Sequence, residues 1–148
     1  MQKCTLALGC FWKPEENFKN KPGIIQTEVG YAGGHNSKVT YDEVCTGNSG
    51  HAEVVQLTYD ENIISYKKIL DLFFKMHDPT QKDMQYPDVG TQYRSEIFYE
   101  NEIQKKEALE IFEEYNKKHD GKVQTNISKI KNYCRAEEYH QKYIEKNR

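Results

Sequence analysis

The amino-acid sequence predicts an α+β domain in which helices cover one face of a mostly antiparallel β-sheet. Two observations support this fold class. Short apolar runs of strand composition alternate with stretches of helical periodicity, and no internal repeat or low-complexity linker separates them. The chain has 148 residues, the usual length of one domain, so we expect residues 1–148 to form a single domain.

A strand and a helix are predicted at the start of the chain, with Cys10 at their junction. Thr5–Gly9 is a short apolar run that indicates a buried strand. Pro14, Glu15 and Glu16 suit a first helical turn, because proline fits there and carboxylates interact favourably with a helix N-terminus. Cys10 would then lie near backbone N–H groups that have no partner within the helix.

Two further strands are predicted beside turns that contain glycine. Ile24–Tyr31 has strand composition and ends at Ala32-Gly33-Gly34, where glycine can adopt a positive φ. The Gly47–Gly50 loop precedes His51–Tyr59, a segment rich in the valine and aromatic residues that strands favour.

The second half of the chain is predicted to contain two amphipathic helices. Ser65–Met76 has apolar residues at helical spacing and is stopped by His77-Asp78-Pro79. Glu102–His119 follows the same pattern and ends at Asp120-Gly121. The apolar residues expected to face the core from this helix are Ile103, Leu109, Ile111, Phe112 and Tyr115.

The remaining segments are a loop, two strands and a last helix. Thr80–Gly90 is polar and is expected to form a long surface loop, the kind of segment that often carries function. Tyr93–Tyr99 and Lys122–Ile127 are predicted strands, and Arg135–Lys146 is a predicted short polar helix. The order strand, helix, strand, strand, helix, strand, with a helix and a strand as additions, matches a ferredoxin-like α/β plait.

Composition and charge exclude several classes of protein. The 21 Lys and Arg residues nearly balance the 23 Asp and Glu residues, which gives a formal net charge of −2. Such a chain has no strong field to attract nucleic acid or an anionic membrane, so we expect neither partner. No segment approaches the roughly 18 apolar residues of a membrane span. Lys13 and Pro14 interrupt the apolar start before it resembles a complete signal peptide, which favours a cytoplasmic location.

The cysteines point to thiol chemistry rather than to metal binding. Cys4, Cys10, Cys45 and Cys134 have spacings that fit neither a zinc ribbon nor a dense disulfide framework. The five histidines also lack the paired spacing of a ligand set, so we expect no bound metal. Cys10 is either a buried structural thiol or a nucleophile whose pKa the helix N-terminus lowers, by about one unit at most.

Other polar residues at predicted strand ends are further candidates, and each has a plainer interpretation. Glu53 lies beside an apolar strand segment, where a carboxylate is costly unless it is paired or protonated. Asp88 closes the long loop and could simply cap it. Tyr41 and Tyr93 could be two ordinary members of the eleven tyrosines.

Seven motifs run in order across almost the whole chain. They are Gly9-Cys10-Phe11-Trp12 with Glu15-Glu16, Gly30-Tyr31-Ala32-Gly33-Gly34, Tyr41-Asp42-Glu43-Val44-Cys45-Thr46-Gly47, Gly50-His51-Ala52-Glu53, His77-Asp78-Pro79-Thr80, Asp88-Val89-Gly90-Thr91-Gln92-Tyr93-Arg94-Ser95 and Ala136-Glu137-Glu138-Tyr139-His140-Gln141. Together they resemble the methionine sulfoxide reductase A family. The resemblance implies a thiol-dependent enzyme that reduces methionine S-sulfoxide, free or within oxidised proteins, and so repairs oxidative damage.

The resemblance assigns catalytic roles to four residues of this sequence. Cys10 corresponds to the nucleophile that attacks the sulfoxide sulfur. Glu53 corresponds to the acid that protonates the sulfoxide oxygen, and a half-buried carboxyl of this kind should have a raised pKa. Tyr41 and Tyr93 correspond to the tyrosines whose hydroxyl groups hold that oxygen.

Three more residues correspond to parts of the family's substrate site. Phe11 and Trp12 match the walls of the pocket that receives the S-methyl group. Asp88 matches a residue that binds the amide or amino group of the substrate's main chain.

Turnover requires a second thiol, because the reaction leaves Cys10 as a sulfenic acid. Many family members carry resolving cysteines in a C-terminal tail, which this sequence lacks, so we expect a one-cysteine type without a bound cofactor. The expected reductant is an external thiol, namely thioredoxin, glutaredoxin with glutathione, or dithiothreitol in vitro. Cys134 is the main internal alternative, while Cys45 and Cys4 are weaker ones, and we expect a monomer.

Two departures from the family pattern lie beside Cys10. Leu8 stands where glycine is frequent, and Lys13-Pro14 replaces a common pair of glycine and an aliphatic residue. Lys13 either favours the Cys10 thiolate or is an ordinary solvated lysine. Two other functions stay open at this point, a thiol peroxidase that uses Cys10 and a peptide-binding or metal-binding module without catalysis.

Overall fold

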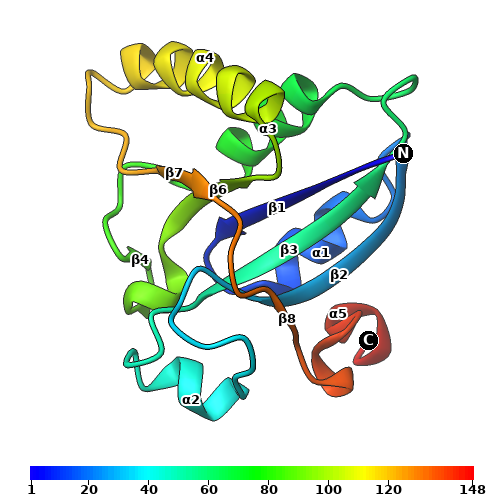
Figure 1. Ribbon diagram of the computed structural model, residues 1–148, viewed down its shortest axis with the longest axis vertical. Coiled ribbons are helices and arrows are strands. Elements are labelled where there is room, and N and C mark those ends of the chain that lie inside the picture. Colours follow the sequence, from blue (N-terminus) through cyan, green and yellow to red (C-terminus); the bar gives the residue numbers. More distant parts are fainter.

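Six strands form one mixed sheet in the computed structural model, which describes residues 1–148 (Figure 1). Their order across the sheet is β7-β6-β1-β3-β2-β8, and every neighbouring pair is antiparallel except β6 and β7. The strands are β1 (Gln2–Leu8), β2 (Ile24–Ala32), β3 (Ala52–Tyr59), β6 (Ser95–Tyr99), β7 (Asn126–Lys129) and β8 (Cys134–Arg135). The α+β class is confirmed, and β6-β1-β3-β2 have the strand order of a ferredoxin-like plait.

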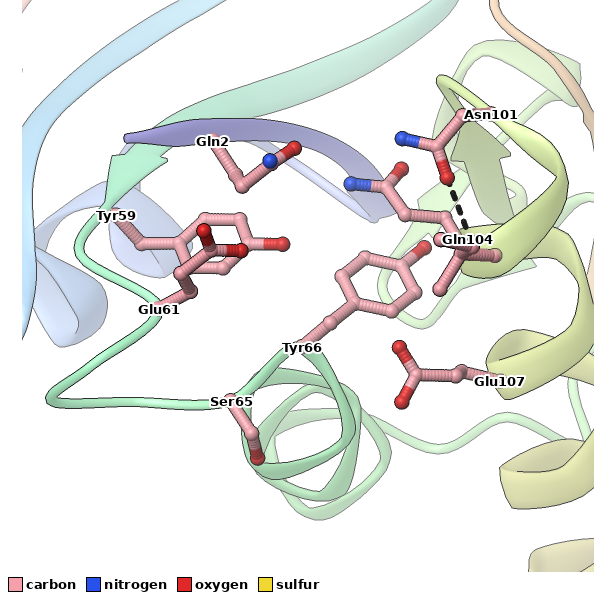
Figure 2. A pocket seen from close by; sticks show the side chains of 9 residues that line it. Gln2, Tyr59, Glu61, Ser65, Tyr66, Asn101, Gln104 and Glu107 are labelled. Carbon is pink, nitrogen blue, oxygen red and sulfur yellow. Dashed lines mark hydrogen bonds between the residues drawn. The ribbon is translucent and has the colours of Figure 1, made fainter.

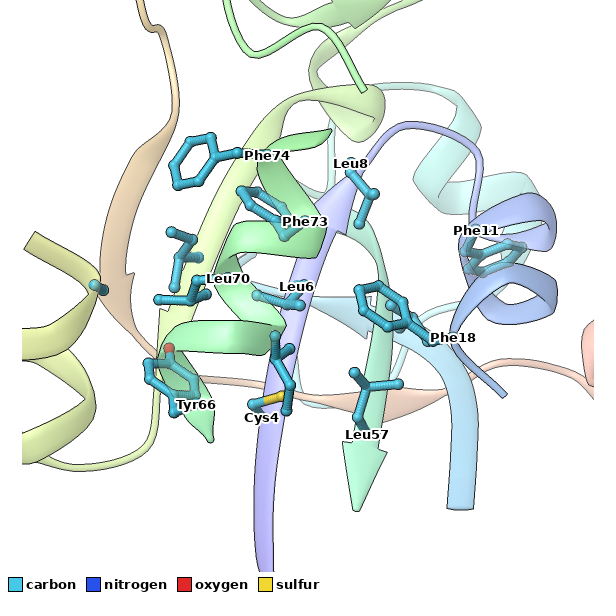
Figure 3. Packing of buried hydrophobic residues seen from close by; sticks show 14 of the residues in the cluster. Cys4, Leu6, Leu8, Phe11, Phe18, Leu57, Tyr66, Leu70, Phe73 and Phe74 are labelled. Carbon is cyan, nitrogen blue, oxygen red and sulfur yellow. The ribbon is translucent and has the colours of Figure 1, made fainter. Parts of the chain in front are cut away.

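The main core lies between this sheet and three helices, α1 (Trp12–Phe18), α3 (Tyr66–Met76) and α4 (Glu102–Lys118). Figure 3 shows apolar side chains of β1, β3, α1 and α3 meeting in this core, among them Leu6, Leu57 and Phe73, all fully buried. Ser65 caps α3 by accepting a hydrogen bond from the Lys68 N–H group at 3.1 Å.

The opposite face of the sheet is covered by an irregular segment rather than by helices. Small side chains of the strands, including Ala7, Ala32 and Ala52, form a second apolar cluster that packs against Ile130 and Tyr133. Gly30 allows this close approach, because a Cβ atom there would lie 2.7 Å from the carbonyl oxygen of Cys134. The sheet therefore has helices on one face only, as the sequence predicts.

Several predicted boundaries are wrong. The strand expected at Tyr93–Tyr99 begins only at Ser95, because Tyr93 ends a 3₁₀ turn (Thr91–Tyr93) and donates its N–H group to the Gly90 carbonyl at 3.0 Å. The strand expected at Lys122–Ile127 is displaced to β7, since the Gln124 N–H group bonds the Pro79 carbonyl instead of the sheet.

Two more segments differ from the prediction. The expected Thr80–Gly90 loop contains a small hairpin of β4 (Met84–Gln85) and β5 (Asp88–Val89). In α4, Ile103 and Leu109 are 73% and 46% exposed. They lie outside the buried stripe of that helix, which consists of Gln104, Ala108, Ile111 and Tyr115.

The single helix predicted for Arg135–Lys146 is replaced by β8, a 3₁₀ turn (Glu138–His140) and the short helix α5 (Tyr143–Lys146). Lys142 interrupts the helical path with a φ of +54°. The Gln141 side chain bonds both the N–H group and the carbonyl of Val29 in β2, at 2.9 and 2.8 Å. These long-range bonds favour a broken path over a regular helix.

A buried carboxylate fixes this C-terminal segment to α1. Glu15 is 1% exposed and accepts hydrogen bonds from the Thr27 hydroxyl, the Lys142 N–H group and the Lys142 ammonium group, at 2.8, 2.8 and 3.2 Å. Because a buried carboxylate without partners is costly, the two donors of Lys142 keep the C-terminal segment in contact with α1, and Thr27 ties the same carboxylate to β2.

The short helix α2 (Tyr41–Cys45) was not expected from the sequence. Thr40 and Glu43 form a capping box at its start, each side chain bonding the backbone N–H group of the other. The Thr-x-x-Glu pattern was therefore the available signal for this helix. No helix has both the length and the apolar character that crossing a membrane requires.

We expect Gln141→Leu to lower the free energy of unfolding by about 1–3 kcal/mol, because it leaves the buried Val29 N–H group without a partner and removes one of the two bonds to the Val29 carbonyl. Urea denaturation measures the change. Gln124→Leu, at an exposed position, is the matched control. Equal stability of the two variants would contradict a structural role for the Gln141 carboxamide.

Candidate active site

Cys10 lies in the bend between β1 and α1 and is partly exposed. The preceding Gly9 has a φ of +97°, and a Cβ atom there would lie 3.0 Å from Gln85, so glycine permits both the turn and the close packing. Burial raises the pKa of the Cys10 thiol to about 12, although a hydrogen bond from the Trp12 N–H group opposes this. The lowered pKa predicted from the helix terminus is wrong, because the cost of desolvating a thiolate is larger.

Glu53 stands in β3 opposite Tyr31 of β2, and it is 1% exposed. Its Oε1 atom accepts a hydrogen bond from the backbone N–H group of Phe11 at 3.2 Å, so the carboxyl lies directly beside the Cys10 peptide. Burial raises the pKa of Glu53 to about 8, and the negative charge of Asp88 adds to the rise, while the Phe11 bond lowers it. The carboxyl is therefore mostly protonated at neutral pH, in the expected direction.

Tyr41 begins α2, and Tyr93 ends the 3₁₀ turn before β6. Burial raises the pKa of Tyr93 to about 12, and that of Tyr41 is raised for the same reason, with the charge of Glu53 contributing to both. The two phenols come from segments far apart in sequence, and both lie close enough to Glu53 for its charge to act on them. Both keep their protons at neutral pH and can donate hydrogen bonds.

Glu137 fixes the start of α2. Its carboxylate accepts the Tyr41 N–H group at 2.9 Å and the hydroxyl of the buried Tyr31 at 2.8 Å. The Tyr41 backbone is therefore tied both to β2 and to the segment after β8.

Phe11 and Trp12 form an aromatic wall next to Cys10. Phe11 is buried against Tyr31 and His140, with ring centroids 5.7 and 5.1 Å apart. Trp12 stays partly exposed and stacks on Tyr143, with centroids 3.8 Å apart and an interplanar angle of 9°. These rings offer an apolar surface of the kind that accepts a methyl group.

His140 and Tyr143 belong to this wall and received no role from the sequence. The indole N–H group of Trp12 donates to His140 Nδ1 at 3.0 Å. Because Nδ1 accepts this bond, the neutral ring carries its proton on Nε2. Burial lowers the pKa of His140, which agrees with a neutral ring. The only signal for His140 in the sequence was its position in the Ala136-Glu137-Glu138-Tyr139-His140-Gln141 motif, which resembles the family.

Asp88 is in β5 and faces Cys10 across a groove. The groove has a volume of about 210 Å³ and includes Cys10, Asp88 and Lys13 in its lining. The negative charge of Asp88 also raises the pKa of Cys10. A second cavity, of about 230 Å³, lies at the opposite end of β1 and β3, and none of the candidate residues lines it (Figure 2).

All four cysteines are free thiols. Cys134 pairs with Tyr31 in the register of β8 and β2, and its thiol donates to the Val39 carbonyl at 3.6 Å. Cys4 is fully buried in β1, and burial raises its pKa. Cys45 is exposed at the end of α2. No group of three or more His, Cys, Asp or Glu side chains has the arrangement of a metal site.

Comparison with known proteins decides the family. Residues 2–148 match the model of a family described as peptide methionine sulfoxide reductase. The peptide methionine sulfoxide reductase MsrA of Pelagibacter ubique is 56% identical over 146 residues, which cover 99% of both chains. This chain belongs to the peptide methionine sulfoxide reductase A family. A second relative of the same name, from Methanosarcina acetivorans, is 50% identical over 148 residues, covering 99% of this chain and 79% of its own.

Solved structures of the family agree with the fold. Reduced Mxr1 from Saccharomyces cerevisiae superposes with a TM-score of 0.95 at 42% identity, covering 99% of this chain and 85% of that one. Mxr1 in complex with Trx2 gives a TM-score of 0.69 at 30% identity, covering 96% and 84%. The chain is thus a peptide-methionine (S)-S-oxide reductase, and members of this family use thiol reductants. The peroxidase and the non-catalytic binding module are set aside.

The raised pKa of Glu53 predicts a pH-dependent stability difference between the protein and its Glu53→Gln variant. A carboxyl whose pKa is raised to about 8 on folding stabilises the native state below its unfolded pKa and loses that contribution as pH rises through 8. We expect the free energy of unfolding to fall relative to the variant by up to about 1.4 kcal/mol per pH unit in this window.

Glutamine keeps the acceptor for the Phe11 N–H group and cannot ionise, so the difference between the two proteins isolates this carboxyl. Urea denaturation of both proteins at intervals between pH 5 and pH 8 gives the measurement. A difference that does not change with pH would show that Glu53 titrates like an exposed glutamate.

Proposed function

We propose that Cys10 reduces the S epimer of methionine sulfoxide by direct attack on sulfur, with Glu53 as the acid. The observation that carries this proposal is the buried Glu53 carboxyl, whose pKa of about 8 leaves it protonated beside Cys10. A sulfoxide oxygen is a poor leaving group until it is protonated, so a protonated carboxyl at this place supplies what the reaction needs. Residues 1–148 act in this proposal as one domain.

The first step forms a bond between Cys10 Sγ and the substrate sulfur. The sulfoxide oxygen takes the proton of Glu53, and the proton that Cys10 loses replaces it on the carboxylate. The raised pKa values of both groups support this exchange, because each holds its proton until the substrate oxygen accepts one. Tyr41 and Tyr93 donate hydrogen bonds to the oxygen, which gains negative charge as the attack proceeds.

The second step releases methionine. The oxygen moves from the substrate sulfur to Cys10 Sγ. The substrate's S–O bond and the bond between the two sulfur atoms break, an S–O bond to Cys10 forms, and the thioether leaves. The substrate has been reduced, and Cys10 has been oxidised to a sulfenic acid.

Phe11 and Trp12 bind the methyl group of the substrate, and Asp88 accepts a hydrogen bond from its main-chain amide or amino group. Phe11 is held rigidly in this role by its burial, while Trp12 is held by its hydrogen bond to His140. A fixed apolar pocket on one side of the sulfur and oxygen-binding groups on another leave room for one sulfoxide epimer only.

The sulfenic acid is reduced by an external thiol in this proposal, which makes the enzyme a one-cysteine type. Cys4 is fully buried, and the Cys134 thiol bonds the Val39 carbonyl, while Cys45 is exposed on α2. Thioredoxin, glutaredoxin with glutathione, and dithiothreitol in vitro are the proposed reductants. A complex of the homologue Mxr1 with Trx2 supports a thioredoxin as one of them.

We propose a cytoplasmic monomer. The exposed Cys45 stays a thiol most readily in a reducing compartment. The exposed large apolar side chains, which include Ile25, Ile63 and Ile103, belong to different elements of the fold.

Chiral separation of a racemic methionine sulfoxide derivative after incubation with enzyme and dithiothreitol tests the reaction. We expect loss of the S epimer only. Cys10→Ser should abolish it, by at least about 10³-fold, because the nucleophile is lost. Glu53→Gln should slow it by about 10²- to 10³-fold, because the acid is lost while the hydrogen bond to Phe11 stays. Activity of Cys10→Ser near that of the unsubstituted protein would refute the mechanism.

Intact-mass spectrometry after adding methionine sulfoxide without a reductant tests the cysteine type. A one-cysteine enzyme gains the mass of one oxygen atom, because Cys10 stops as the sulfenic acid. A loss of two hydrogens would instead reveal an internal disulfide. If that loss disappears in Cys134→Ser and persists in Cys45→Ser, Cys134 is the resolving thiol and the external route is wrong.

A further inference from the structure

The groove beside Cys10 extends well past the residues that the proposed reaction uses. It has a volume of about 210 Å³ and runs along α1, between that helix and the β4–β5 hairpin. We call it the α1 groove. Its lining includes Cys10, Lys13, Asn17, Gln85, Tyr86 and Asp88.

The α1 groove shares Cys10 and Asp88 with the proposed substrate site but none of its other residues. The side chains proposed to hold the sulfoxide oxygen or the methyl group do not line the α1 groove; they are Phe11, Trp12, Tyr41, Glu53 and Tyr93. The groove therefore reaches the reactive sulfur without entering the pocket where the substrate's oxygen and methyl group lie.

The geometry of substitution at sulfur indicates a role for the α1 groove. An attacking sulfur must approach Cys10 Sγ opposite the bond to the departing oxygen. In the sulfenic acid that oxygen lies with Glu53 and the two tyrosines, so the incoming thiol needs an approach that those residues do not occupy. The α1 groove is such an approach.

Two polar side chains that α1 contributes to the groove have no partner within the protein. Lys13 and Asn17, one helical turn apart on α1, are exposed, and neither side chain makes an ion pair or hydrogen bond. Tyr86 is 78% exposed. On another face of α1 the charged groups are paired, since Lys19 bonds both Glu16 and Glu145.

These groups together match a particular class of thiol. The Lys13 ammonium group attracts a carboxylate, and the Asn17 amide can bond a peptide group. Asp88, at the Cys10 end, accepts hydrogen bonds from N–H groups. A small peptide thiol with a free carboxylate carries all of these complementary groups, and a groove of about 210 Å³ is of the size for a small molecule.

We propose that the α1 groove binds the reducing thiol, a small peptide thiol whose carboxylate is attracted by Lys13. The inference rests on the proposed function, because it requires the sulfenic acid on Cys10. The thiol sulfur bonds to Cys10 Sγ while the S–O bond of the sulfenic acid breaks, and the O–H group leaves as water together with the proton that the thiol loses. A second thiol then attacks the mixed disulfide, which restores the Cys10 thiol and releases the oxidised disulfide of the reductant.

Charge reversal at Lys13 tests the inference with three thiols. Glutathione brings more carboxylate than ammonium charge, dithiothreitol brings neither, and cysteamine brings an ammonium group only. The measured quantity is the second-order rate constant with which each thiol regenerates Cys10 at saturating methionine sulfoxide. Lys21→Glu is the matched control, because it makes the same charge change at an exposed site that does not line the groove.

We expect Lys13→Glu to lower the ratio of the glutathione rate constant to the dithiothreitol rate constant by about three- to tenfold. The ratio of cysteamine to dithiothreitol should rise, and Lys21→Glu should change neither ratio. These opposite signs separate binding of a carboxylate from a general change in the reactivity of Cys10, which would affect the three thiols alike.

Unchanged ratios in Lys13→Glu would overturn the inference. A rise in the KM for methionine sulfoxide with unchanged ratios would also overturn it, because the groove would then hold the substrate's main chain instead. If dithiothreitol fails to support turnover by the unsubstituted protein, the proposed function itself fails. If dithiothreitol works and glutathione shows no saturable or charge-dependent reaction, only the α1 groove inference is wrong.

Discussion

The hydrogen bond from the Phe11 N–H group to the buried Glu53 carboxyl joins the two parts of the sheet on which the site depends. Cys10 is placed by the end of β1, and Glu53 is placed by β3, its antiparallel neighbour. Because the carboxyl is almost fully buried, it needs a partner to remain there, and the peptide following Cys10 provides one. The contact that stabilises the buried carboxyl therefore also holds Glu53 beside Cys10, the proposed acid beside the proposed nucleophile.

The C-terminal segment completes the site from outside the plait. His140 and Tyr143 support Trp12, while Glu137 supports Tyr41. These contacts come from the broken path of the segment, which Gln141 and the buried Glu15 stabilise. Two buried polar groups with several hydrogen bonds each thus determine the shape of the aromatic wall.

Local patterns in the sequence were sufficient to predict those segments whose structure is decided by neighbouring residues in the chain. The Cys10 junction between β1 and α1 and the helix beginning near Ser65 are of this kind. The C-terminal segment could not be predicted, because its path depends on bonds to Val29 and Glu15, which are distant in sequence. The direction of the Cys10 pKa shift was missed for the same reason, since burial by distant segments outweighs the nearby helix terminus. The roles of the site residues came from the family resemblance and remain proposals.

The position of Trp12 has an optical consequence. It is the only tryptophan of the chain, so the indole emission of the whole protein comes from one ring. That ring contacts Tyr143 face to face and donates its N–H group to His140. Its emission therefore reports whether the C-terminal segment is docked, without any label. The molecule carries an intrinsic fluorescent probe in the aromatic wall beside Cys10, which also forms one side of the proposed methyl pocket.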